Sequence, residues 1–175
     1  VSGQTIGAEN ATLTFMVGGD EQVFQRALVV MQVLGKLIQH VGETGAGFAV
    51  KAVNNMLLAA NLCATLEGFS TLKAHGVALD SALACINASS GKSVATEMVL
   101  PQRILNREFP LTFALTLLNK DTGIALDLAQ QAKLSTPVLA LARQMVNMAT
   151  SQATPQHDFS TLAQWYEQFN HLTLE

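Results

Sequence analysis

The sequence predicts an all-α fold, and three observations support this prediction. Residues 47–75 form one mostly apolar run that would extend about 40 Å as a helix, at 1.5 Å per residue. Further segments with apolar residues at helical spacing follow it along the chain. Only one stretch, residues 12–17, has the alternation and β-rich composition that are typical of a strand. We therefore expect helices packed around one long buried helix, preceded by a short strand.

Start and stop signals support each expected element. Gly18-Gly19 ends the strand, and Asp20 then opens a helix whose first turn is stabilised by acidic residues. Gly35 is expected at the C′ position of that helix, and Gly76 at the end of the long one. The remaining helices are expected as a short one capped by Asp80, followed by helices at residues 93–106, 112–133, 137–150 and 160–171.

The composition limits the class of protein. With 175 residues, the chain is long enough for one domain with its own core. Its net charge of −3 provides no basic surface, which argues against nucleic acid as a partner. Only 13% of the residues are charged whereas 49% are hydrophobic. We therefore expect another domain, or another subunit of a homo-oligomer, to cover part of the apolar surface.

Cysteine usage and apolar patterning indicate where the protein works. Cys63 and Cys85 both lie in apolar helical segments, and we expect both to be buried free thiols. Because the chain has neither a disulfide framework nor a leader-like start, the expected location is cytoplasmic. Three asparagines interrupt the longest apolar stretch, so we expect no membrane-spanning helix and no membrane partner.

Two common kinds of catalytic site are not expected. The four histidines of the chain form no i, i+4 pairs with one another, so the sequence predicts no metal site. The chain also lacks a Gly-x-Ser-x-Gly motif, which would indicate a serine nucleophile.

Lys51 is the strongest catalytic candidate. It lies in the first turns of the long helix, directly after a loop that contains Gly42, Gly45 and Gly47. Desolvation disfavours a charged ammonium, and the positive end of the helix dipole adds to this effect. Both lower the pKa of a lysine toward neutrality, where it can give and take protons. Since Asn55 lies one turn further on the same face, the segment is typical of a prepared general acid/base.

These residues resemble the catalytic segment of the β-hydroxyacid dehydrogenases. That family includes 3-hydroxyisobutyrate dehydrogenase, tartronate semialdehyde reductase and, more distantly, 6-phosphogluconate dehydrogenase. The shared pattern is Gly-x-x-Gly-x-Gly-x-x-x-Lys-x-x-x-Asn. Further segments similar to family motifs are Val1-Ser2-Gly3-Gln4, Met16-Val17-Gly18-Gly19, Lys120-Asp121 and Asp158-Phe159-Ser160. The resemblance implies an all-α fold like the C-terminal domain of 6-phosphogluconate dehydrogenase.

The resemblance also implies roles for individual residues. Lys51 would protonate the carbonyl oxygen during reduction and remove the hydroxyl proton during oxidation, while NAD or NADP carries the hydride. Ser2, Gly3 and Asn55 would bind the substrate, although Gln4 stands where the family usually has a second glycine. The residues that would face the cofactor are Lys120, Phe113 and Gly47.

By the same resemblance, the chain corresponds to the C-terminal domain of such an enzyme. It has no Gly-x-Gly-x-x-Gly in a strand–turn–helix context, so we expect its Rossmann domain to be missing. Residues 1–18 would be the end of that domain and an interdomain strand. Residues 19–175 would form the helical catalytic, substrate-binding and dimerisation domain. The full enzyme would interconvert a short 3-hydroxy acid and its semialdehyde or keto acid, and the chain alone would be inactive.

Other functions stay open at this point. Oxidative decarboxylation of a sugar acid phosphate is disfavoured, because the chain lacks a clear basic cluster for a phosphate. Reduction of an imine is disfavoured, because imine reductases of this fold typically replace the lysine that Lys51 matches. A non-catalytic helical interaction module derived from the fold is the alternative from another class. A module of that kind has no need of the pair Lys51 and Asn55.

Overall fold

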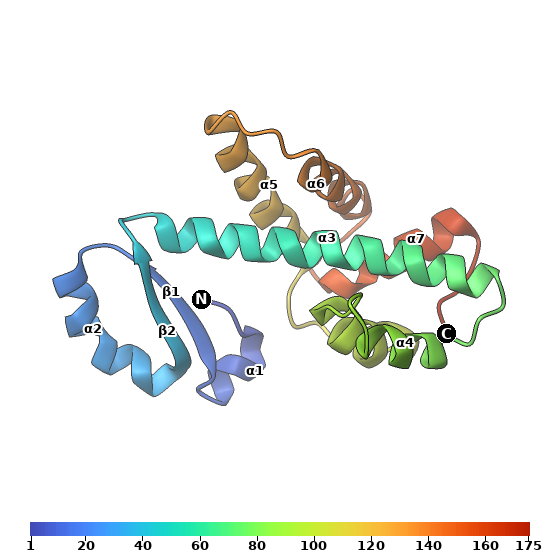
Figure 1. Ribbon diagram of the computed structural model, residues 1–175, viewed down its shortest axis with the longest axis horizontal. Coiled ribbons are helices and arrows are strands. Elements are labelled where there is room, and N and C mark those ends of the chain that lie inside the picture. The colour runs from blue at the N-terminus through green and yellow to red at the C-terminus, as the bar shows by residue number, and fades with distance from the viewer.

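One long helix organises the molecule, whose computed structural model describes residues 1–175. In chain order the elements are α1 (Gln4–Glu9), β1 (Leu13–Gly18), α2 (Glu21–Leu34), β2 (Gly35–Gly42), α3 (Ala46–Ala74), α4 (Leu79–Asn87), the π-helix η1 (Ala95–Leu105), α5 (Leu115–Gln131), α6 (Pro137–Thr150), the 3₁₀ turn η2 (Phe159–Thr161) and α7 (Leu162–Asn170). Figure 1 shows α3 crossing the molecule, with the two strands, α1 and α2 at its N-terminal end and the helices that follow α3 in the chain along the rest of it.

The predicted all-α fold is confirmed, and most helix boundaries lie within a few residues of the prediction. The carboxylate of Asp20 caps α2 by accepting a hydrogen bond from the Val23 amide at 3.0 Å. Gly76 follows α3 with a φ of +73°, a left-handed conformation that suits glycine. The predicted cap at Asp80 is wrong, since Asp80 lies in the first turn of α4 and Ala78 occupies the N-cap position.

The β-layer is larger than the sequence predicts. Instead of one strand remnant, β1 pairs in parallel with β2, and α2 connects them. Gly35 is not a left-handed C′ residue, because its φ of −146° is extended and it opens β2. A Cβ there would lie 2.5 Å from the Leu13 carbonyl oxygen and 2.7 Å from the Phe15 ring, so this close pairing needs glycine. β2 was not predicted from the sequence, because its side chains are mixed in polarity and only half of its residues are exposed, so no regular alternation marks it as a strand.

The main core lies between α3 and the elements that follow it. Leu62, Leu66, Leu100, Leu118 and Leu162 are fully buried there and come from α3, η1, α5 and α7. Burial of this much apolar side chain is the dominant contribution to the stability of a fold of this size.

The two cysteines differ in burial. Cys63 is buried in the core, and burial raises the pKa of its thiol to about 11, so it stays protonated near neutral pH. Cys85 is exposed, and the prediction that both thiols are buried is therefore wrong for Cys85.

The long helix is only partly buried. By length and composition alone, α3 could cross a membrane. The three asparagines therefore do not exclude a membrane-spanning helix, contrary to the expectation from the sequence. The core helix of a folded domain has the same length and composition. Here α3 packs against β1, α5 and α6, and it serves as that core helix.

Candidate active site

A cavity of about 920 Å³ lies where the first residues of the chain face α3 and η1. Lys51 and Asn55 line it from α3, and Arg103 lines it from η1. The charged residues of the lining are the cations Lys51, Lys92 and Arg103, and no aspartate or glutamate contributes to it. A concave site with only positive charges in its wall favours an anionic ligand such as a carboxylate.

Lys51 is half-buried in the wall of this cavity, in the second turn of α3. Its ammonium lies 5.9 Å from the centre of the Phe113 ring. Burial is the largest influence on its pKa and lowers it from the usual value for a lysine. The nearby charge of Lys120 lowers it further, whereas Asp121 opposes both effects. Lys51 therefore has the lowered pKa that the sequence predicts for an acid/base lysine.

Asn55 lies one turn after Lys51 and is held by a buried carboxylate. Its Nδ2 donates to Oδ2 of Asp121 at 2.6 Å, which joins α3 to α5. The other oxygen of Asp121 lies 2.7 Å from Nζ of Lys120. The amide of Asn54 donates to Oδ1 of Asn55 at 3.1 Å. Asn55 is thus fixed in orientation and lines the cavity, and its contact with the substrate stays a prediction.

The contact of Asp121 with Asn55 could not be predicted from the sequence. Lys120-Asp121 stands out in the sequence only as a segment similar to a family motif, but Asp121 is buried and accepts a hydrogen bond from Asn55, 66 positions earlier. No local pattern reveals a contact across that separation. The only signal in the sequence was an acid next to a basic residue in an apolar helix.

Ser2 and Gly3 both line the cavity, as the prediction of a substrate-binding role requires. The backbone amide of Ser2 donates to the Thr14 carbonyl at 2.9 Å, so it is not free to bind a ligand. The Ser2 hydroxyl is the polar group of this residue that can bind a ligand. Gln4 has a φ of 59°, which is uncommon for a residue other than glycine. Its Oε1 accepts a hydrogen bond from Arg103 at 3.2 Å.

Phe113 is positioned by Asp158, a fully buried carboxylate at the start of η2. Oδ2 of Asp158 accepts hydrogen bonds from the backbone amides of Thr112 and Phe113 at 2.9 and 3.0 Å. The Phe113 carbonyl accepts from the Phe159 amide at 2.8 Å. These bonds hold the segment before α5 in place, so that the Phe113 ring lies beside Lys51.

The other two residues predicted to face the cofactor do not line the cavity. Lys120 is 60% exposed beside Asp121. Gly47 is buried where α3 meets β1, and a Cβ there would collide with the Met16 carbonyl. That contact gives Gly47 a structural reason to be glycine. Its contact with a cofactor stays a prediction, as does that of Lys120.

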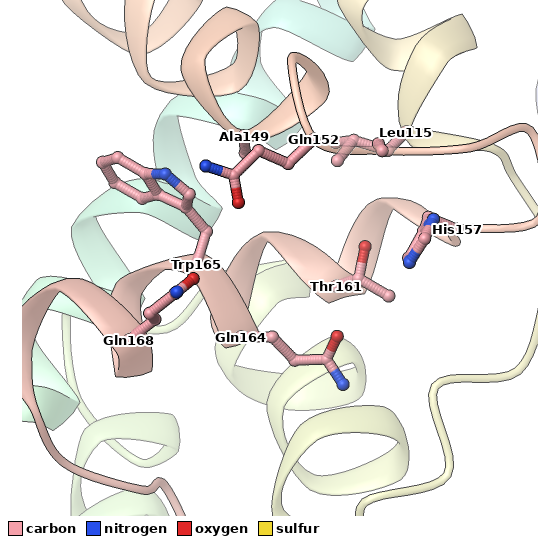
Figure 2. A pocket seen from close by; sticks show the side chains of 9 residues that line it. Leu115, Ala149, Gln152, His157, Thr161, Gln164, Trp165 and Gln168 are labelled. Carbon is pink, nitrogen blue, oxygen red and sulfur yellow. The ribbon is translucent and has the colours of Figure 1, made fainter.

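A second, smaller pocket of about 140 Å³ lies between the end of α6 and α7 (Figure 2). Its polar side chains are those of Gln152, His157, Thr161, Gln164 and Gln168, with Trp165 at one edge. It shares no lining residue with the large cavity and contains neither a carboxylate nor a lysine or arginine. No three of the histidines, cysteines and acids of the chain come together in a group that could hold a metal ion.

Two family models match the chain. One, described as the NAD-binding domain of NADP-dependent 3-hydroxyisobutyrate dehydrogenase, covers residues 45–166. The other, described as the NAD-binding domain of 6-phosphogluconate dehydrogenase, covers residues 1–42. The two matches meet in the loop before α3. The domain boundary that the sequence predicts lies earlier, after residue 18. The boundary at residue 18 stays a prediction.

Individual relatives agree with these matches. The chain is 38% identical to 2-(hydroxymethyl)glutarate dehydrogenase of Eubacterium barkeri, over 96% of this chain and 56% of that protein. It is 33% identical to NAD-dependent L-serine dehydrogenase of Pseudomonas aeruginosa, over 95% of this chain and 58% of that protein. The chain thus spans somewhat more than half the length of these relatives.

A solved structure shows the same fold. The structure of Mycobacterium tuberculosis 3-hydroxyisobutyrate dehydrogenase with L-serine superposes with a TM-score of 0.86. It is 32% identical in sequence, and the match covers 94% of this chain and 58% of that one. Together with the family models, these similarities support NAD or NADP as the cofactor. The chain belongs to the β-hydroxyacid dehydrogenase family, with 3-hydroxyisobutyrate dehydrogenases among its relatives.

Proposed function

We propose that this chain is the substrate-binding and acid/base half of an NAD(P)-dependent dehydrogenase. It acts together with a dinucleotide-binding domain of the kind that makes up the rest of its relatives. The reaction interconverts a short 3-hydroxy acid and its semialdehyde or keto acid. The observation that carries this proposal is the position of Lys51, which has a lowered pKa and lies beside Asn55 in a cavity without acidic residues.

Lys51 moves the proton. In the oxidative direction, its neutral amine takes the proton of the substrate hydroxyl, and in the reductive direction its ammonium returns a proton to the carbonyl oxygen. A pKa lowered by burial supports this role, because a lysine at its usual pKa is almost never neutral near pH 7. Asp121 keeps the shift from becoming larger and holds the amide of Asn55. Asn55 would orient the substrate oxygen toward Lys51.

Ser2 and Gly3 would bind the carboxylate of the substrate from the opposite wall. Both line the cavity beside Lys51 and Asn55. The Ser2 hydroxyl and the Gly3 amide are suitable donors for a carboxylate oxygen. The Ser2 amide is excluded from this role because it is bonded to Thr14.

The residues near Lys51 fit a nicotinamide cofactor. The space before α3 is open, since a Cβ on Gly45 would meet no atom within 4 Å. Phe48, in the first turn of α3, is 81% exposed and offers apolar surface. Lys120, Phe48 and Phe113 are the residues that would hold the nicotinamide end. When bound, this group supplies the acceptor or donor of the hydride.

Lys51→Ala, in the enzyme with its dinucleotide-binding domain, tests the proposal. We expect kcat to fall by about 10²–10⁴, the usual contribution of a general acid/base, with little change in the affinity for NAD(P). Lys51→Arg should rescue poorly, because a guanidinium stays protonated and cannot exchange protons near neutral pH. Steady-state kinetics with 3-hydroxyisobutyrate and with L-serine would measure this.

Lys73→Ala is the matched control. Lys73 lies in the same helix but outside the cavity, and its Nζ donates to the Glu175 carbonyl at 2.8 Å. This variant should keep the activity of the unchanged enzyme. Near-normal kcat in Lys51→Ala would show that the lysine is structural. The alternative of a non-catalytic helical module predicts instead that the unchanged enzyme does not oxidise either substrate.

A further inference from the structure

The cavity extends well beyond the corner occupied by Lys51. Its volume of about 920 Å³ is near the upper end of the range for drug-sized ligands, about 300–1,000 Å³. A short hydroxy acid would fill only a small part of it. The remainder is lined by η1 and by α1 with the residues before it, where Arg103 and Gln4 contribute polar groups.

An aromatic wall connects Lys51 to Arg103. The Lys51 ammonium lies 5.9 Å from the centre of the Phe113 ring, and the Phe113 and Phe159 rings are 6.1 Å apart. The guanidinium of Arg103 lies 5.2 Å from the centre of the Phe159 ring. Lys51 thus lies beside one of two neighbouring rings and Arg103 beside the other, and all four side chains line the same cavity.

One side of the Arg103 guanidinium is fixed by the protein. Its NH1 donates to Thr112 Oγ1 at 2.7 Å, to the Pro110 carbonyl at 3.2 Å and to Asp158 Oδ1 at 3.4 Å. The side chain is only 13% exposed, so these bonds set its orientation. Asp158 balances part of the charge, but it also accepts hydrogen bonds from Phe113 and Ser160.

The other side of the guanidinium is available to a ligand. NH2 has one protein partner, Oε1 of Gln4 at 3.2 Å, and Nε has none. A guanidinium presents five N–H donors in a planar fork, and the Nε–NH2 edge can pair with both oxygens of one carboxylate. Gln4 is exposed, and its amide also has an NH₂ group that can donate to the same carboxylate after a rotation.

We propose that Arg103 and Gln4 form a second anion-binding subsite, which selects hydroxy acids that carry a second carboxylate. This inference rests on the proposed function, because the first carboxylate and the reacting hydroxyl lie at Ser2, Gly3 and Lys51. The aromatic wall accommodates the apolar carbons between the two ends. Gln4, in place of the glycine usual in the family, provides a polar contact that a glycine cannot provide.

Matched substrates test the subsite in the enzyme with its dinucleotide-binding domain. 2-(Hydroxymethyl)glutarate and 2-(hydroxymethyl)pentanoate have the same reacting centre and differ in a terminal carboxylate or methyl. We expect kcat/KM to be at least about tenfold higher for the dicarboxylate, since hydrogen bonds to charged groups contribute about 1.5–3 kcal/mol. Equal values for the two acids would overturn the proposal.

Two variants assign the effect to the named residues. Arg103→Lys keeps a positive charge but loses the planar fork, and it should lower kcat/KM for the dicarboxylate by about tenfold while changing that for the pentanoate little. Gln4→Gly removes the amide and suits the left-handed backbone at this position, so it should fold normally. It should reduce the preference for the dicarboxylate by a few-fold. An unchanged preference in both variants would overturn the proposal.

A binding measurement separates this inference from the proposed function. Glutarate has no hydroxyl and cannot react, so calorimetry reports on the subsite without any chemistry. Glutarate should bind more tightly than pentanoate, and Arg103→Lys should remove the difference. If no hydroxy acid is oxidised but this pattern holds, the proposed function fails and the subsite stands. If 6-phosphogluconate is oxidised and 2-(hydroxymethyl)glutarate is not, the subsite takes a phosphate and the proposal of a second carboxylate fails.

Discussion

At the residue scale, the pKa of Lys51 depends on two neighbours of opposite charge. Asp121 raises its pKa and Lys120 lowers it, while burial provides the largest influence, toward a lower pKa. Asp121 and Lys120 are adjacent in sequence and form an ion pair of 2.7 Å. The Lys-Asp pair in α5 can therefore set the pKa of a lysine in α3 without touching the substrate.

This arrangement predicts opposite pH shifts in two variants. Oxidation needs Lys51 in its neutral form, so kcat/KM should rise with pH through the pKa of Lys51. Asp121→Asn removes the charge that raises this pKa and should move the rising limb to lower pH. Its amide oxygen can still accept the bond from Asn55. Lys120→Met removes a charge that lowers the pKa and should move the limb to higher pH.

The pH dependence of kcat/KM, measured for the unchanged enzyme and both variants, checks this prediction. Lys73→Met serves as the control, since Lys73 lies in α3 but does not line the cavity, and its profile should not move. Shifts of the two variants in the same direction would contradict the electrostatic assignment.

At the element scale, the start of α3 depends on close contact with β1. A Cβ on Gly47 would collide with the Met16 carbonyl and lie 3.1 Å from the Gly18 amide nitrogen. These are backbone atoms, which cannot move aside as the end of a flexible side chain can. The glycine loop therefore lets α3 pack closely against β1. This contact fixes the position of Lys51, one turn later in α3, in the wall of the cavity.

Two glycine-to-alanine variants in the same helix should have opposite effects. Gly47→Ala should lower the free energy of unfolding by about 1–3 kcal/mol, the usual cost of overpacking. Gly68 is exposed within α3, and a Cβ there would meet no atom within 4 Å. Gly68→Ala should raise the free energy of unfolding by about 0.5–1 kcal/mol, because alanine favours helix over glycine. Urea unfolding measures both, and a neutral Gly47→Ala would refute the packing argument.

At the scale of the whole molecule, much apolar surface is uncovered. Val29, Val30 and Val33 on α2 are exposed, as are Val138 and Leu141 on α6. Together with the low content of charged residues, 13%, this agrees with a chain that is covered by other domains or subunits. The homo-oligomer and the cytoplasmic location expected from the sequence stay predictions.

The 175 residues alone should not oxidise a hydroxy acid. They contain Lys51, the proposed acid/base residue, and the cavity, but no glycine-rich turn that would bind the pyrophosphate of a dinucleotide. NAD(P)H formation with 2-(hydroxymethyl)glutarate should be undetectable for the chain alone. It should appear when the dinucleotide-binding domain is fused before residue 1. Turnover by the chain alone at a normal rate would contradict this division of roles.

The sequence by itself determined the helical fold and the family, and it predicted Lys51 as the catalytic residue. Apolar spacing and cap residues fix helices locally, and the glycine loop, Lys51 and Asn55 lie close together in the chain. Only the tertiary structure decided that β2 pairs with β1, that Asp121 is buried against Asn55, and that Arg103 and Gln4 meet in the cavity. Arg103 and Gln4 are 99 residues apart, and Asn55 and Asp121 are 66 apart. Contacts over such separations depend on how helices pack, which no local pattern of residues encodes.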